Sequence, residues 1–221
     1  MNNKSLKIFK STVILLPLLF FLIISCNQNE SPNLTSPTVK DMLNSRVDSI
    51  APGDFKTYGQ GAWGSPPHGH NPGQYLKNNW DLLDTVIIGC DTGYTITFTN
   101  WQGVNHFLPQ GRKPVPLDTS LENPNYHISV FAGQVLALAL NIEFDLADTS
   151  FGGSSFNLKD LCVTMGTFEG WTVEEVFEEA NAVLGGCSTE YTPMELNYAV
   201  EQINENFEEG HVGNYLQFCT Q

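Results

Sequence analysis

The chain has 221 residues, and its hydrophobic fraction of 41% is enough to build one globular core. Charged residues make up only 15% of the chain, which argues against a coiled coil or a solvated acidic tail. The formal net charge is −14, from 10 Lys and Arg against 24 Asp and Glu. Nucleic-acid affinity depends on Lys and Arg that release counterions from phosphates, so we exclude a nucleic-acid partner.

The first 25 residues have the pattern of an export signal. Three lysines precede a continuous apolar run at 13–24, which is short for a membrane span and typical of a signal peptide. The run ends in Ile24, Ser25 and Cys26. An aliphatic residue followed by a small residue directly before a cysteine resembles the lipobox of bacterial lipoproteins. We therefore predict a signal peptide at 1–25 and lipidation of Cys26; the alternative is an ordinary signal anchor with an incidental cysteine.

Cleavage before Cys26 would leave seven Lys and Arg against 24 Asp and Glu, a net charge of −17. Anionic lipid headgroups would repel such a chain, so the acyl chains are its only expected contact with a membrane. Residues 26–53 are predicted to be a flexible tether, with a short helix over 38–50, and 54–221 one globular domain. The expected location is the bacterial cell envelope, with the outer membrane favoured.

Four further cysteines follow the signal, namely Cys90, Cys162, Cys187 and Cys219. Thiols of exported proteins pair in an oxidising compartment, and an even number of them predicts two disulfides. The sequence leaves all three connectivities open. A catalytic thiol or a zinc site is the alternative, although no pair has the close spacing of a zinc knuckle.

The first half of the predicted domain alternates loops with short elements. A Gly- and Pro-rich stretch at 58–70 is incompatible with regular structure. Asn71 followed by proline predicts a capped helix that runs to about Leu83. Two β-branched and aromatic runs predict a hairpin over 86–99, the only sheet expected. A short helix over 100–107 and a long surface loop follow.

The second half is predicted to be helical. Residues 127–144 are apolar around almost the whole helical circumference, which indicates a helix at the centre of a core. Polar side chains within this segment favour a core helix over a second membrane span. Thr172 and Thr192 each begin a capping box, followed by an amphipathic helix. The predicted fold class is mainly α: a compact helical domain around helix 127–144, with one small hairpin.

Aromatic and amide side chains in the first half could form a sugar-binding surface. Tyr58, Gln60, Trp63 and Trp101 are the candidates, and the glycine neighbours of Trp63 make its ring the best candidate for exposure. Packing in a core is the favoured interpretation of these rings, and the sugar-binding surface is the alternative.

Metal binding and catalysis have weaker signals. His68 and His70 could grip a divalent ion if another histidine completed the site, and an exposed pair in a loop is the alternative. Carboxylates on the two amphipathic helices fall opposite the apolar stripes, where a solvated face is expected rather than acid–base chemistry. The chain has no nucleophile elbow, P-loop, dinucleotide fingerprint or zinc-protease motif, so no cofactor and no catalytic residue is predicted.

Four motifs carry a resemblance to a known domain. They are Gly-Gln-Gly-Ala-Trp-Gly at 59–64, Phe-Thr at 98–99 with Phe-Leu-Pro at 107–109, Val-Phe-Ala-Gly-Gln-Val-Leu-Ala-Leu at 130–138, and Ile-Asn-Glu-Asn-Phe at 203–207. In this order they resemble an uncharacterised extracellular domain of bacterial secreted and surface-anchored proteins. The resemblance covers about residues 56–216. It implies an extracytoplasmic location and a stable helical module, and it brings no site residues with it.

The function expected from these patterns is that of a non-catalytic, lipid-anchored envelope protein. Its acidic, disulfide-stabilised module would bind an envelope partner or act structurally. A carbohydrate-binding lipoprotein that uses the 58–70 loop and Trp101 is one alternative. A metal-dependent enzyme or metal-handling protein centred on His68 and His70 is the other.

Overall fold

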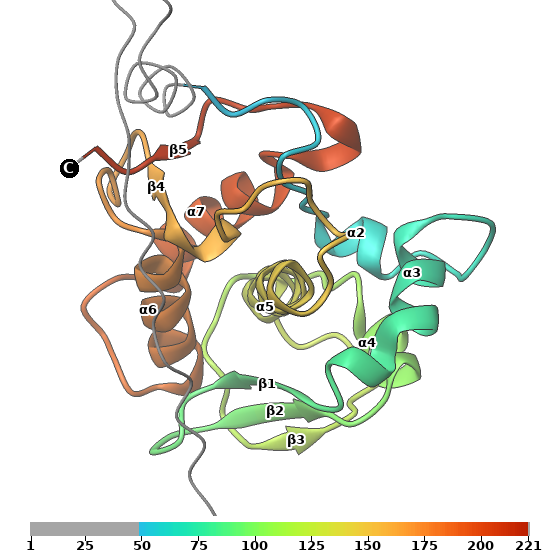
Figure 1. Ribbon diagram of the computed structural model, residues 1–221. Coiled ribbons are helices and arrows are strands. Elements are labelled where there is room, and N and C mark those ends of the chain that lie inside the picture. The colour runs from blue at the N-terminus through green and yellow to red at the C-terminus, as the bar shows by residue number, and fades with distance from the viewer. Residues whose placement is uncertain (1–48, 221) are drawn as a thin grey trace, which may run out of the picture. The chain divides into compact units, whose positions relative to one another are not determined.

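The computed structural model describes residues 49–220. The predicted signal peptide, Cys26 and most of the predicted tether lie outside the described part, as do residues 38–48 of the helix predicted over 38–50; its last two residues are not helical. Helix α5 (Val130–Ala147) lies at the centre and the other elements surround it (Figure 1). Every side chain from 131 to 142 is buried. The sequence places the start of this helix three residues too early, because 127–129 are extended and Ser129 is the residue before the first turn.

The helices begin where side-chain caps predict them. Asn71 accepts a hydrogen bond from Gln74 N at the start of α3 (Pro72–Asn79), which continues into the 3-10 helix η1 (Trp80–Leu82). Asn100 caps α4 (Trp101–Phe107) in the same way. The short α2 (Gln60–Trp63) lies inside the Gly- and Pro-rich stretch, where no helix is predicted.

Two full capping boxes start α6 (Val173–Gly185) and α7 (Pro193–Glu205). The Thr172 and Thr192 hydroxyls accept hydrogen bonds from the backbone N–H groups of Glu175 and Glu195. In turn, the carboxylates of these two glutamates accept hydrogen bonds from the backbone N–H groups of the two threonines. Gly186 ends α6 at φ 82°, a left-handed conformation that glycine adopts without a steric penalty. Both helices match their predictions, and they turn their apolar faces towards the core around α5.

Two small sheets complete the fold. The predicted hairpin is present as β1 (Val86–Gly89) and β2 (Thr95–Phe98), and β3 (Leu121–Glu122) adds a parallel strand to β2. A second sheet pairs β4 (Leu161–Val163) with β5 (Leu216–Phe218). The 3-10 helices η2 (Leu158–Asp160) and η3 (Glu208–Gly210) precede β4 and follow α7.

The predicted helical domain is present, and the short strands beside it make the fold mixed α/β rather than clearly mainly α. Over the described range there are six helices and five short strands. The additional strands have two or three residues each, too few for alternation of apolar and polar side chains to show in a sequence.

Two disulfides resolve the cysteine pairing. Cys90, in the turn of the hairpin, is bonded to Cys187 just beyond α6. Cys162 on β4 is bonded to Cys219, which ties the last residues of the chain to the second sheet. The prediction of two disulfides is confirmed, and the bonds indicate an oxidising compartment, extracellular or periplasmic.

Helix α5 is the one described helix long and apolar enough to cross a membrane, with 18 residues and a mean hydropathy of 1.5. The surrounding elements bury 72% of it, as expected for the core helix of a folded domain.

Candidate functional site

Trp63, the best candidate for an exposed ring, is buried. Its side chain is 0% exposed, and its indole N–H donates to Asn141 Oδ1 over 3.1 Å. The ring stacks on Phe144 at 5.4 Å and takes an edge contact from Tyr58 at 5.2 Å. These rings form the inner cluster, whose members are Tyr58, Trp63, Tyr75, Phe144 and Phe151. Trp63 is therefore a core residue and offers no face to a sugar.

A buried amide network holds the segment that carries Trp63 against the central helix. Asn141 of α5 accepts from Tyr58 N at 2.9 Å and donates to Tyr58 O at 3.1 Å. The Asn141 amide also donates to Asn204 of α7, which in turn donates to Gln134. Buried amides must be paired in this way, because an unpaired one costs about 1–3 kcal/mol. The network is structural: it fixes the strand-like chain at 57–59 onto two helices.

The remaining members of the predicted sugar surface are dispersed. Gln60 Oε1 accepts from Gln110 N at 2.8 Å, so its amide is engaged within the fold. Trp101 is half-buried on α4, with Lys77 Nζ 5.4 Å from its ring centroid. Tyr58 is half-buried within the inner cluster. The structure thus brings Tyr58 and Trp63 together inside the core and leaves Trp101 on a different helix.

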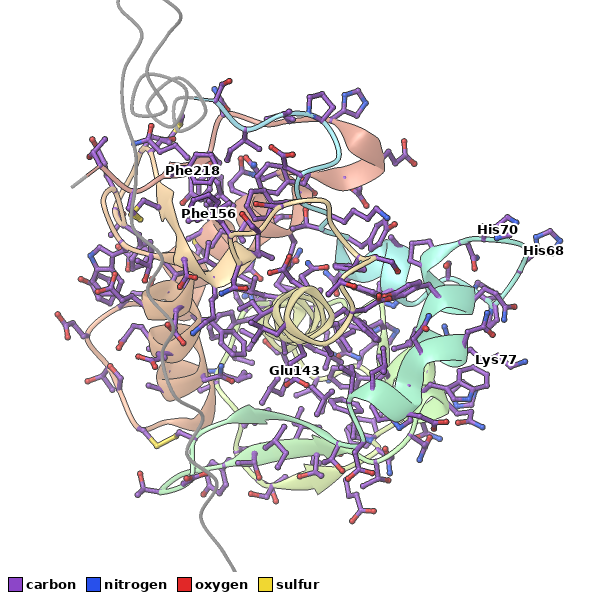
Figure 2. All side chains as sticks on the ribbon, viewed as in Figure 1. His68, His70, Lys77, Glu143, Phe156 and Phe218 are labelled. Carbon is purple, nitrogen blue, oxygen red and sulfur yellow. A yellow bond between two sulfur atoms is a disulfide. The ribbon has the colours of Figure 1, made fainter. Side chains whose placement is uncertain are left out.

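His68 and His70 are exposed at the tip of the loop before α3, where both side chains point away from the body (Figure 2). Among residues 49–220 there is no group of three or more His, Cys, Asp or Glu placed to hold a metal ion. All four described cysteines are in disulfides, so none of them supplies a thiolate.

Most carboxylates of the amphipathic helices have structural partners. Glu175 and Glu195 complete the capping boxes, and backbone hydrogen bonding holds the pKa of Glu195 below its ordinary value. Lys159 Nζ lies 2.7 Å from Glu174 Oε1. Glu143 of α5 differs, because it is half-buried and has no hydrogen-bond partner among the described residues (Figure 2). Loss of solvent raises its pKa to about 7.

An apolar depression among the described residues has large exposed side chains in its lining. We call it the aromatic groove; it has a volume of about 380 Å³ and lies between the 166–168 loop and the first turns of α7. Met194 and Tyr198 on α7 are 68% and 61% exposed, values high for large apolar side chains. Its lining residues are Gly166, Thr167, Phe168, Met194, Glu195, Tyr198, Ala199 and Tyr215.

A second depression, the acidic hollow, lies on α6 and has a volume of about 360 Å³. It is lined by Trp171, Glu175, Glu178, Glu179 and Ala182. Three rings in mutual contact separate it from the groove: Phe168, Trp171 and Tyr191, with centroids 4.9–5.6 Å apart. We call these rings the aromatic ridge. Phe168 belongs to the groove and Trp171 to the hollow, so the two depressions are parts of one surface.

This surface has a single sign of charge. Four glutamates line the two depressions, and neither is lined by a lysine or arginine. The nearest cation in sequence to the ridge is Lys159, and its ammonium is already paired with Glu174. The low pKa of Glu195 keeps the groove carboxylate ionised at neutral pH. An apolar floor with an anionic rim is suited to binding.

Sequence reasoning missed the aromatic groove. The capping box and apolar stripe identify α7, and they place Met194 and Tyr198 outside the stripe. Exposed large apolar residues at 194 and 198, four apart on one helical face, were the available signal. The spacing on α7 carries no information about the 166–168 loop that forms the opposite wall.

Comparisons with protein-family models, with curated proteins and with solved structures found no match to this chain. The resemblance to an extracellular domain stays a prediction, and the surface just described is the basis for a proposed function.

Proposed function

We propose that this chain is a lipid-anchored protein of the bacterial cell envelope that binds a protein partner through the aromatic groove and acidic hollow. The observation that carries the binding role is the exposure of Met194 and Tyr198 beside the aromatic ridge. Large apolar side chains gathered in a depression, with carboxylates around them, have the composition of a recognition surface. The role proposed is binding and not catalysis.

The anchoring part of the proposal has separate support. The lysines, the apolar run at 13–24 and the Ser25-Cys26 pair favour lipidation of Cys26. The two disulfides agree with export, because such bonds persist in oxidising compartments. Residues 27–48 would allow the binding module to stand away from a membrane that its negative charge disfavours.

The anchor is tested with Cys26→Ser in the full-length chain. We expect the wild type to remain with the membrane fraction and to incorporate radiolabelled palmitate, and the variant to lose the label. Palmitate incorporation that persists in Cys26→Ser would contradict lipidation at this cysteine.

The binding surface is tested by photo-crosslinking in the intact envelope. A benzophenone amino acid replaces Tyr198, and in a matched control it replaces Tyr126, which is exposed to a similar degree (61% against 55%). We expect a discrete crosslinked product at Tyr198 that the additional change Met194→Glu abolishes, and no such product at Tyr126. Equal crosslinking at both positions would show that this surface is not selective.

A further inference from the structure

The two connected depressions differ in chemistry, and this difference bears on what the surface binds. The aromatic groove is walled by Phe168, Met194, Tyr198 and Tyr215, with one carboxylate from Glu195 at its edge. Its volume falls within the range of about 300–1,000 Å³ that is typical of ligand-holding pockets. An apolar side chain that enters it leaves water on contact with these walls, which favours an aliphatic or aromatic anchor.

The acidic hollow favours a different group. Trp171 presents a ring there, beside Glu178 and Glu179. A lysine or arginine is attracted both to an indole face and to carboxylates. Phe168 lines the groove, Trp171 lines the hollow, and these two rings are in contact with each other and with Tyr191. One chain that crosses the ridge can therefore place an apolar side chain on one side and a cation on the other.

Charge decides between the possible occupants. A second copy of this chain is disfavoured, because the mature protein would carry a net charge of −17 and the surface itself has only carboxylates in its lining. Anionic lipid headgroups are disfavoured for the same reason. A basic polypeptide is attracted, and its apolar residues can fill the groove.

We infer that the aromatic groove and acidic hollow together bind a basic polypeptide segment, with an aliphatic or aromatic side chain in the groove and a lysine or arginine over Trp171. This inference rests on the proposed function and specifies the chemical class of the partner.

The test uses the mature chain made soluble by Cys26→Ser and labelled with ¹³C at its methionine methyl groups. After the signal the sequence has three methionines, and two of them, Met165 and Met194, lie at or beside the groove and are exposed. Three acetylated and amidated peptides serve as probes: Lys-Lys-Leu-Leu-Lys-Lys, Lys-Lys-Ser-Ser-Lys-Lys and Glu-Glu-Leu-Leu-Glu-Glu. The Met194 methyl resonance reports occupation of the groove directly.

We expect the Lys/Leu peptide to shift the Met194 resonance and to bind at least about tenfold more tightly than the Lys/Ser peptide, which lacks the apolar anchor. The Glu/Leu peptide should produce no shift at the same concentration. Raising sodium chloride to about 0.5 M should weaken the Lys/Leu complex at least about threefold, since exposed charges are screened.

Two pairs of variants separate the contributions. Tyr198→Ala should weaken the Lys/Leu complex at least about fivefold, and Tyr126→Ala, equally exposed elsewhere, should leave it unchanged. Glu178→Gln should weaken it about twofold, and the same change at the exposed Glu122 on β3 should have no effect.

Equal affinity for the Glu/Leu and Lys/Leu peptides would overturn the inference, since the groove would then select apolar groups without regard to charge. A Met194 shift caused by neutral oligosaccharides and by none of the peptides would overturn it in favour of a glycan ligand. Both results are distinguishable from failure of the proposed function, which the crosslink at Tyr198 tests in the envelope without any peptide.

Discussion

Two aromatic clusters of similar composition differ in how far the rest of the chain covers their tryptophan rings. In the inner cluster, Trp63 is enclosed by α5 and by the 144–151 segment, and its indole N–H has a partner in Asn141. In the aromatic ridge, Phe168 is buried, whereas Trp171 and Tyr191 remain partly exposed beside two depressions. The residue types are the same, and what differs is whether another part of the chain covers them.

The difference also concerns how polar atoms are satisfied. Within the inner cluster the phenol of Tyr75 donates to Asp148, so even its peripheral hydroxyl has a protein partner. On the ridge side the exposed phenol of Tyr198 has no hydrogen-bond partner among the described residues. Aromatic rings with a solvent-exposed polar group are typical of recognition surfaces, whereas the buried Trp63 indole N–H is paired within the fold.

The largest effect should come from opening the inner cluster. Trp63→Ala removes a fully buried ring that contacts Tyr58, Phe144 and Phe151. We expect a loss of about 3–5 kcal/mol of unfolding free energy from the cavity and the lost transfer energy. Urea unfolding followed by circular dichroism measures it. A loss below about 1 kcal/mol would mean that Trp63 is not packed as described.

The disulfides should rank next. Replacing both Cys90 and Cys187 by Ser, or both Cys162 and Cys219, should lower the unfolding free energy by about 2–4 kcal/mol in each case. The first pair spans 97 residues and the second 57, so chain entropy makes the first effect larger by only about 0.5 kcal/mol. The second pair borders the β4–β5 sheet, close to Tyr215 in the groove. Removal of the Cys162–Cys219 bond should therefore also weaken binding of the Lys/Leu peptide. Unchanged peptide affinity would show that the groove does not depend on this sheet.

The half-buried position of Glu143 on α5 predicts that the stability of the protein depends on pH. Its folded-state pKa of about 7 is above the ordinary 4.5, so the folded state holds the proton more tightly than the unfolded state. The protonated carboxyl therefore contributes fully to the unfolding free energy below about pH 4.5, and this contribution is lost as the pH rises through 7. Glu143→Gln, which stays neutral, should match the wild type near pH 5 and exceed it by about 1 kcal/mol at pH 8, after allowance for solvent screening. Parallel stability curves for the two proteins would contradict the shift.

The smallest effect on stability should come from a substitution in the aromatic groove. Tyr198→Ala should change the unfolding free energy by less than about 0.5 kcal/mol, because the side chain is mostly exposed. The same variant should still weaken binding of the Lys/Leu peptide at least about fivefold. A destabilisation comparable to that of Trp63→Ala would remove the distinction between the two clusters.

Local signals in the sequence predict much of the fold. The caps at Asn71, Asn100, Thr172 and Thr192 and the hairpin over 86–99 depend on residues close in the chain, and all of them are present. The central helix follows from composition alone. The β2–β3 and β4–β5 pairings join segments 25 and 55 residues apart through two or three residues each, so no local pattern encodes them.

The candidate site was predictable only in part. The glycines around Trp63 suggest an open ring, but the cover comes from Phe144 and Phe151, some 80 residues later in the chain. Conversely, helical spacing marks Tyr198 as solvent-facing and leaves out the loop at 166–168 that forms the other wall. Whether an aromatic side chain is core or surface thus depends on long-range packing, which periodicity does not report.

The most direct test of the central claim is hydroxyl-radical footprinting read by mass spectrometry, on the purified chain and on the chain in its native envelope. We expect Met194 and Tyr198 to be oxidised readily in the purified chain and protected in the envelope, with Trp63 unreactive in both. Equal oxidation of Met194 and Tyr198 in the two preparations would contradict a bound partner at the groove. Oxidation of Trp63 in the folded chain would contradict the closed inner cluster.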